Sequence, residues 1–172
     1  AGASSAREGR WEKGPGESFL RALPDIPYIA EDLGVITPEV RALRDRMGWP
    51  GMNVLQFAFD SSSRDSLYLP HNHLRNSVSY LGTHDNDTCL GWLAGLSPAD
   101  RKYFSDYCGG TGREAALRAL FASPSDLVIV TMQDVLGMRT GRINTPATAS
   151  GNWTFRLTDD SYRNKTAFLK EL

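Results

Sequence analysis

The sequence has few cysteines, no long apolar run and no excess of charge of one sign. Its two cysteines, Cys89 and Cys108, are too few for a disulfide scaffold and lack the spacing of a metal site, so we expect a reducing, cytoplasmic location. No apolar run approaches the roughly 20 residues of a membrane helix, and residues 1–16 lack the apolar segment of a signal peptide. Nineteen Lys and Arg against 20 Asp and Glu, without a basic cluster, disfavour nucleic acid as a partner.

The composition is that of a globular unit with its own core. The 172 residues are 41% hydrophobic and 23% charged, which disfavours disorder. The chain begins at Ala1 rather than at methionine. We therefore expect either a processed protein or a fragment of a longer one.

Four short apolar runs are predicted to be buried strands, at residues 26–30, 54–59, 78–81 and 127–130. Helices are predicted between them from their capping residues. Thr37-Pro38 starts one, Ser97-Pro98 starts a second that ends at Gly109, and a third covers residues 113–122. This alternation of strands and helices predicts an α/β fold with a parallel sheet.

Polar residues follow three of the predicted strands. Glu31-Asp32 follows the first, the string THDNDT at 83–88 the third, and Gln133-Asp134 the fourth. In (β/α) barrels catalytic groups lie at the carboxyl ends of strands, so this placement favours a TIM barrel over a doubly wound sheet. A barrel needs eight strands and about 250 residues, so four strands predict its C-terminal half. We expect one partial catalytic domain, with an entering loop at 1–17, barrel elements at 18–158 and a C-terminal helix at 159–172.

Seven short strings, in their order and spacing, resemble those of the 4-α-glucanotransferases, also called amylomaltases or disproportionating enzymes, of glycoside hydrolase family 77. Each string alone is weak evidence, whereas their order along almost the whole chain is specific. The strings are AEDLG at 30–34, PGM at 50–52, LQFAF at 55–59, LPHN at 69–72, GTHDNDT at 82–88, QDVL at 133–136 and SGNW at 150–153.

The resemblance implies a retaining double displacement on α-1,4-glucans, without a metal or another cofactor. Segments would pass between maltooligosaccharides, or from amylose to glucose as acceptor. Glu31 matches the general acid/base of the family, and Asp85 matches the carboxylate that stabilises the transition state. His84 is expected to contact the same sugar. The further substrate-binding candidates are Asp32, Asn86, Asn144 and Pro146.

The nucleophile is the part of the site that we do not find. The resemblance implies an aspartate at the end of an earlier barrel strand, and no position of this sequence matches it. We therefore expect the chain alone to be inactive. Structural readings stay open for several candidates: Asn86 and Asp87 would brace the turn as readily as they would bind sugar, Asn144 and Pro146 would shape a loop, and Trp153 would pack.

Two alternative functions also stay open. A half barrel without its nucleophile could be a non-catalytic glucan-binding remnant. A metal-dependent hydrolase is the less favoured alternative, because His-x-His in a Pro-Asn loop is a weak signal. Its ligands would come from His71, His73, His84, Asp85 and Asp87.

Overall fold

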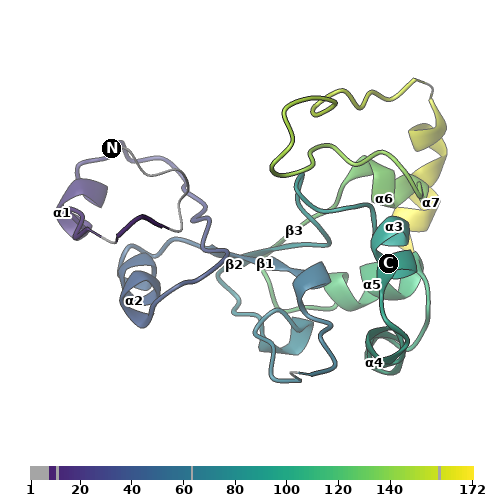
Figure 1. Cartoon of the computed structure of the whole chain (residues 1–172), viewed down its shortest axis with the longest axis horizontal. Helices are drawn as coiled ribbons and strands as arrows, with labels where there is room; N and C mark the ends of the chain where they lie inside the picture. Colours follow the sequence, from purple (N-terminus) through teal and green to yellow (C-terminus); the bar gives the residue numbers. More distant parts are fainter. Residues whose placement is uncertain (1–7, 11, 63, 159) are drawn as a thin grey trace.

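The computed structural model describes residues 8–10, 12–62, 64–158 and 160–172, and its centre is a three-stranded parallel sheet (Figure 1). The strands are β1 (Gly51–Val54), β2 (Ser77–Tyr80) and β3 (Leu127–Ile129), in the order β1-β2-β3. Gly51 pairs with Ser77 and Val78 pairs with Leu127, both in parallel register. The predicted α/β class is confirmed in this form. Part of the predicted entering loop at 1–17 lies outside the described residues.

Two of the four predicted strands are wrong in position or in kind. Residues 26–30 form no strand, although the Ala30 amide donates a hydrogen bond to the Pro50 carbonyl at 2.9 Å. Pro27 has no amide proton to give to a ladder, which weakens pairing there. The run 54–59 lies mostly after β1, because Leu55–Phe57 is a 3₁₀ helix (η2) that buries Leu55 completely. Apolar runs do not by themselves distinguish such turns from strands.

The helices follow their local capping signals. Ser97 Oγ accepts the Asp100 amide at 3.1 Å at the start of α4, and Gly109, with φ of 68°, ends it. The short helices α3 and α6 were not predicted. Helix α3 directly follows the polar stretch at 83–88, and α6 contains Gln133-Asp134. The helices are α1 (Glu17–Leu20), α2 (Pro38–Arg46), α3 (Cys89–Gly95), α4 (Pro98–Cys108), α5 (Arg113–Phe121), α6 (Met132–Leu136) and α7 (Thr166–Lys170), with 3₁₀ helices η3 (Pro70–Asn72) and η4 (Ser161–Lys165).

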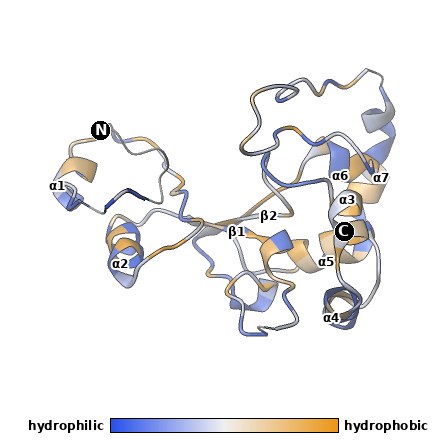
Figure 2. Ribbon diagram, in the orientation of Figure 1, coloured by the Kyte–Doolittle hydropathy of each residue, from blue (hydrophilic) through white to orange (hydrophobic). Residues whose placement is uncertain are grey.

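The hydrophobic core lies between the sheet and helices α3 to α5. Phe59, Phe104 and Leu117 are among its buried side chains, and the Phe59 and Phe104 rings meet edge to face at 5.0 Å. Figure 1 shows α3 to α7 at one end of the molecule and α1 and α2 at the other, and Figure 2 shows hydrophobic colour along the sheet and on α5. Within the described ranges, no helix combines the length and apolar character needed to cross a bilayer.

Candidate active site

A cavity of about 470 Å³ lies where β2 and β3 end. Glu31 lines it from the segment before α2, His84 and Asp85 from the turn after β2, and Gln133 from α6. Parallel strands end at the same edge of a sheet, which is why polar groups from distant segments meet here. The structure therefore brings together Glu31, His84 and Asp85, the three residues that the sequence assigned to the chemistry.

His84 and Asp85 form a pair at the wall of this cavity. His84 Nε2 lies 3.4 Å from Asp85 Oδ1, and about half of each side chain is exposed. Asn144 Nδ2 donates a hydrogen bond to the same Oδ1 at 2.5 Å, and Arg142 donates to the Asp85 carbonyl. Within the described part of the chain Asp85 Oδ2 has no partner. One carboxylate oxygen is thus held in place while the other can accept a hydrogen bond from a ligand.

The turn that carries this pair is braced by its own side chains. Asn86 Oδ1 accepts the Thr83 amide at 2.8 Å and the Thr83 hydroxyl at 2.9 Å, and Asp87 Oδ1 accepts the Thr88 amide at 2.7 Å. Gln56 Nε2, in η2, donates to the Asp87 carbonyl at 2.8 Å. Asn86 does not line the cavity. Its hydrogen bonds are those of the bracing role.

A buried carboxylate connects this turn to α6. Asp134, 2% exposed, accepts the Cys89 amide at the first residue of α3 at 2.7 Å and the Thr131 hydroxyl at 3.0 Å. Burial raises the pKa of Asp134 above its usual value, against the lowering effect of these hydrogen bonds. The sequence contained the signal for this arrangement, because Thr131-x-x-Asp134 has the spacing of a capping box.

Glu31 and Asp32 are neighbours in sequence, but they face different cavities. The Glu31 carboxylate has no hydrogen bond or ion pair with any described residue, and it lines the 470 Å³ cavity. Asp32 pairs with Arg44 and accepts the Met52 amide at 2.8 Å, and it lines a second cavity of about 510 Å³. Side chains alternate along an extended segment, which separates the two carboxylates. The structure therefore does not place Asp32 in the cavity of Glu31.

The loop that follows α6 reaches back over the His84-Asp85 turn. The Asn144 amide donates to the His84 carbonyl at 3.0 Å, and the Trp153 ring lies 5.0 Å from the His84 ring at an angle of 34°. Pro146 is exposed and does not line the cavity. Sequence reasoning missed Arg142, and it treated Trp153 as a packing residue, whereas 58% of this side chain is exposed.

Two of the three histidines of the alternative metal site, His71 and His73, do not line the cavity. His73 is buried, with Nε2 at 3.0 Å from the Tyr68 carbonyl and Nδ1 at 2.8 Å from Ser79 Oγ. His71 Nδ1 contacts the Tyr107 hydroxyl at 2.7 Å. Among the described residues, no group of three or more His, Cys, Asp or Glu is arranged to hold a metal ion.

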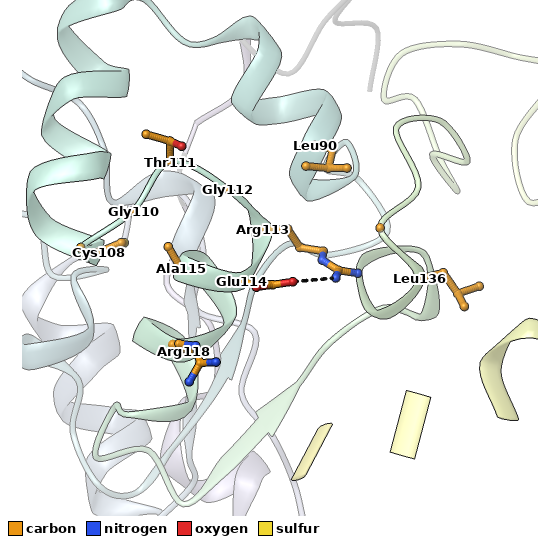
Figure 3. A pocket seen from close by; sticks show the side chains of 12 residues that line it. Leu90, Cys108, Gly110, Thr111, Gly112, Arg113, Glu114, Ala115, Arg118 and Leu136 are labelled. Atoms are coloured by element: carbon orange, nitrogen blue, oxygen red, sulfur yellow. Dashed lines mark ion pairs between the residues drawn. The ribbon is translucent and has the colours of Figure 1, made fainter. Parts of the chain in front are cut away.

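A larger cavity, of about 600 Å³, lies at the start of α5 and not at the strand ends (Figure 3). One of its charged groups, Arg113, donates to the Asp134 and Val135 carbonyls at 3.1 and 2.8 Å and stacks on the Phe168 ring. Figure 3 shows Arg113 directed towards Glu114, with 3.7 Å between their charged atoms. Arg113 therefore anchors α6, and the smaller cavity remains the candidate site.

Three comparisons agree on the relatives of this chain. A 4-α-glucanotransferase of Synechocystis is 44% identical over 170 residues, covering 92% of this chain and 34% of that protein. The enzyme of Thermus thermophilus is 44% identical over 173 residues, covering 91% and 34%. The solved structure of an amylomaltase from Streptococcus agalactiae in complex with acarbose superposes with a TM-score of 0.89 at 35% identity, covering 96% of this chain and 36% of that one.

The chain thus spans about one third of the length of the curated relatives it matches. The sequence profile described as 4-α-glucanotransferase matches residues 1–161, nearly all of the chain. The sequence strings at the cavity and this profile match indicate the same family. The chain belongs to the 4-α-glucanotransferase family, glycoside hydrolase family 77.

Proposed function

We propose that this chain is the C-terminal catalytic portion of a longer 4-α-glucanotransferase, which transfers α-1,4-glucan segments by a retaining double displacement. The observation that carries the proposal is the meeting of Glu31, His84 and Asp85 in one cavity at the strand ends. The parallel sheet, and relatives about three times as long, support the C-terminal half of a (β/α) barrel. Its parts would be the entering loop at 1–17, the barrel elements at 18–158 and the C-terminal helix at 159–172.

Glu31 is the general acid/base in this proposal. Its carboxyl group, which has no partner among the described residues, can donate a proton to the departing glycosidic oxygen. It then takes a proton from the hydroxyl of the incoming sugar, as the second half of the reaction requires. The retaining mechanism places a second carboxylate about 5 to 5.5 Å away. That nucleophile would come from the part of the enzyme that precedes this chain.

Asp85 and His84 bind the sugar whose bond is broken. Asn144 fixes Asp85 Oδ1, which leaves Oδ2 to accept sugar hydroxyls. Hydrogen bonds to a charged group contribute about 1.5 to 3 kcal/mol each. Hydrogen bonds that shorten as the sugar ring flattens towards an oxocarbenium ion lower the activation barrier of the reaction, and not only the KM. Asn144 thus serves the substrate through Asp85.

The remaining candidates take supporting roles. Asp32 holds the backbone beside Glu31 through Arg44 and Met52, Asn86 shapes the turn, and Pro146 shapes the loop after α6. Maltooligosaccharides and amylose would be donors and glucose an acceptor. The relative from Streptococcus agalactiae was solved with acarbose, which supports a carbohydrate ligand for this cavity. Free Cys89 and Cys108 support the cytoplasmic location.

The test is disproportionation of maltotriose by the full-length enzyme, followed as glucose release. Glu31→Gln is expected to abolish release while the circular dichroism spectrum and melting temperature stay unchanged. Glu12→Gln, which alters a carboxylate on the surface beside Arg10, is the matched control and retains activity. The 172-residue chain alone is expected to release no glucose. Full transfer activity in Glu31→Gln would refute the proposal.

A further inference from the structure

Residues 143–153 form a loop that is closed by its own hydrogen bonds. The Trp153 amide donates to the Ile143 carbonyl at 2.7 Å, which joins the two ends. Inside the loop, Asn152 Oδ1 accepts the Thr145 amide at 2.9 Å and Asn152 Nδ2 donates to the Thr148 carbonyl at 3.2 Å. A loop held by its own contacts keeps the side chains at its ends in fixed positions, without help from a ligand.

This loop contacts the His84-Asp85 pair at several points. Asn144 reaches the His84 carbonyl through its amide and Asp85 Oδ1 through its side chain. Arg142, just before the loop, reaches the Asp85 carbonyl. The Trp153 ring covers the His84 ring. Residues 142–153, far from His84 and Asp85 in the sequence, thus contact both the backbone and the side chains of this pair.

Trp153 has two properties that packing alone does not explain. Its φ is 61°, and a bulky residue rarely adopts this left-handed conformation, because its Cβ crowds the backbone. More than half of its side chain is exposed, so the strain is not balanced by burial in the core. Among the described residues, the aromatic ring that its indole contacts is that of His84. Unfavourable backbone geometry of this kind clusters at functional sites.

We propose that Trp153 is a positioning residue that fixes the orientation of the His84 imidazole, so that Nε2 faces Asp85 before the substrate arrives. His84 has two rotatable side-chain bonds, and about half of it is exposed. The indole ring lies against one face of the imidazole. His84 Nε2, at the edge of the imidazole, stays directed towards Asp85 Oδ1, and these two atoms are 3.4 Å apart. The pair is thereby assembled in advance, which lowers the entropy lost on reaching the transition state. The kinetic consequence rests on the proposed function, whereas the orientation of the ring does not.

The orientation is tested by NMR of the full-length enzyme with ¹³C-labelled histidine rings. The His84 signal is assigned by its loss in His84→Gln. Trp153→Leu is expected to shift this signal downfield, because the shielding ring current is removed, while Trp153→Phe keeps part of the shift. Trp49→Leu removes an indole that packs on Tyr28 at 4.7 Å instead, and it is the matched control that leaves the His84 signal in place. An unmoved signal in Trp153→Leu would overturn the inference.

The kinetic consequence is tested with a double-mutant cycle on maltotriose transfer. Trp153→Leu is expected to lower kcat about tenfold with a smaller change in KM, and Trp153→Phe to restore most of it. In the His84→Gln background, Trp153→Leu should lower kcat by less than about twofold, because Trp153 acts through His84. Equal losses in both backgrounds would mean that Trp153 contacts the sugar directly, and would overturn the inference. A wild-type enzyme without transfer activity refutes the proposed function. The NMR experiment would still show whether Trp153 orients the His84 ring.

Discussion

Asp32 and Arg44 form a nearly buried ion pair directly beside Glu31. Their side chains are only 8% and 12% exposed, and Asp32 Oδ1 also accepts the Met52 amide at the start of the sheet. The pair ties the segment before α2 to both α2 and β1. It therefore fixes the backbone that carries Glu31, although Asp32 itself faces another cavity.

Removal of one partner of this pair is expected to be costly. Asp32→Asn leaves Arg44 without the less exposed of its two carboxylate partners, and breaking buried pairs typically costs about 3 to 5 kcal/mol. Urea unfolding should show this loss, together with reduced transfer activity of the full-length enzyme. Asp45→Asn is the control, because Asp45 also binds Arg44 but is 58% exposed, so its removal should cost less than about 1 kcal/mol. Similar losses in both variants would contradict this role.

The ion pair of Asp32 and Arg44 leaves no space for a side chain at position 51, which is Gly51. A Cβ placed on Gly51 would lie 2.6 Å from Asp32 Oδ2, closer than van der Waals contact allows. Gly51→Ala is expected to displace Asp32 and to destabilise the protein by about 1 to 3 kcal/mol, the usual range for overpacking. Thermal unfolding measures the effect. Gly95→Ala, where the added Cβ meets nothing within 4 Å, should leave the melting temperature nearly unchanged.

Asp134 is expected to stabilise the start of α3. Asp134→Ala leaves the buried Cys89 amide without its acceptor, and an unsatisfied buried group costs about 1 to 3 kcal/mol. Asp134→Asn retains an acceptor for that amide and should cost less, because burial already disfavours the charged carboxylate. Hydrogen exchange at the Cys89 amide measures the local effect. An equal loss in both variants would show that the charge, not the hydrogen bond, matters.

His73 makes stability depend on pH. Burial lowers the pKa of His73 below its usual value, so the folded state binds a proton less readily than the unfolded state. Its contribution to stability is full above the unfolded pKa, near 6.5, and falls as the pH drops towards the folded pKa. Below the folded pKa the loss levels off. Urea titrations from pH 8 to 5 should show this slope, and it should be smaller in His73→Gln. An unchanged slope would exclude His73 as its source.

Local signals explain which parts of the fold were predictable. The helices at Pro38–Arg46 and Pro98–Cys108 follow from capping residues and proline at the first position, which act within one turn. The strand Leu127–Ile129 lies within its predicted run, and Ser77–Tyr80 begins and ends one residue before the predicted 78–81. Residues 26–30 were wrongly predicted, because an apolar run becomes a strand only when a partner strand pairs with it.

The sequence by itself determined the family, and it predicted Glu31, His84 and Asp85 as the residues of the chemistry, because both depend on short strings at fixed spacing. Only the tertiary structure decided which neighbours do something else. Asp32 forms an ion pair with Arg44, Asn86 accepts a hydrogen bond within its own turn, and the Trp153 ring contacts the His84 ring. The physical reason is that these choices depend on groups distant in the chain, which meet only when the sheet and the loop after α6 are folded.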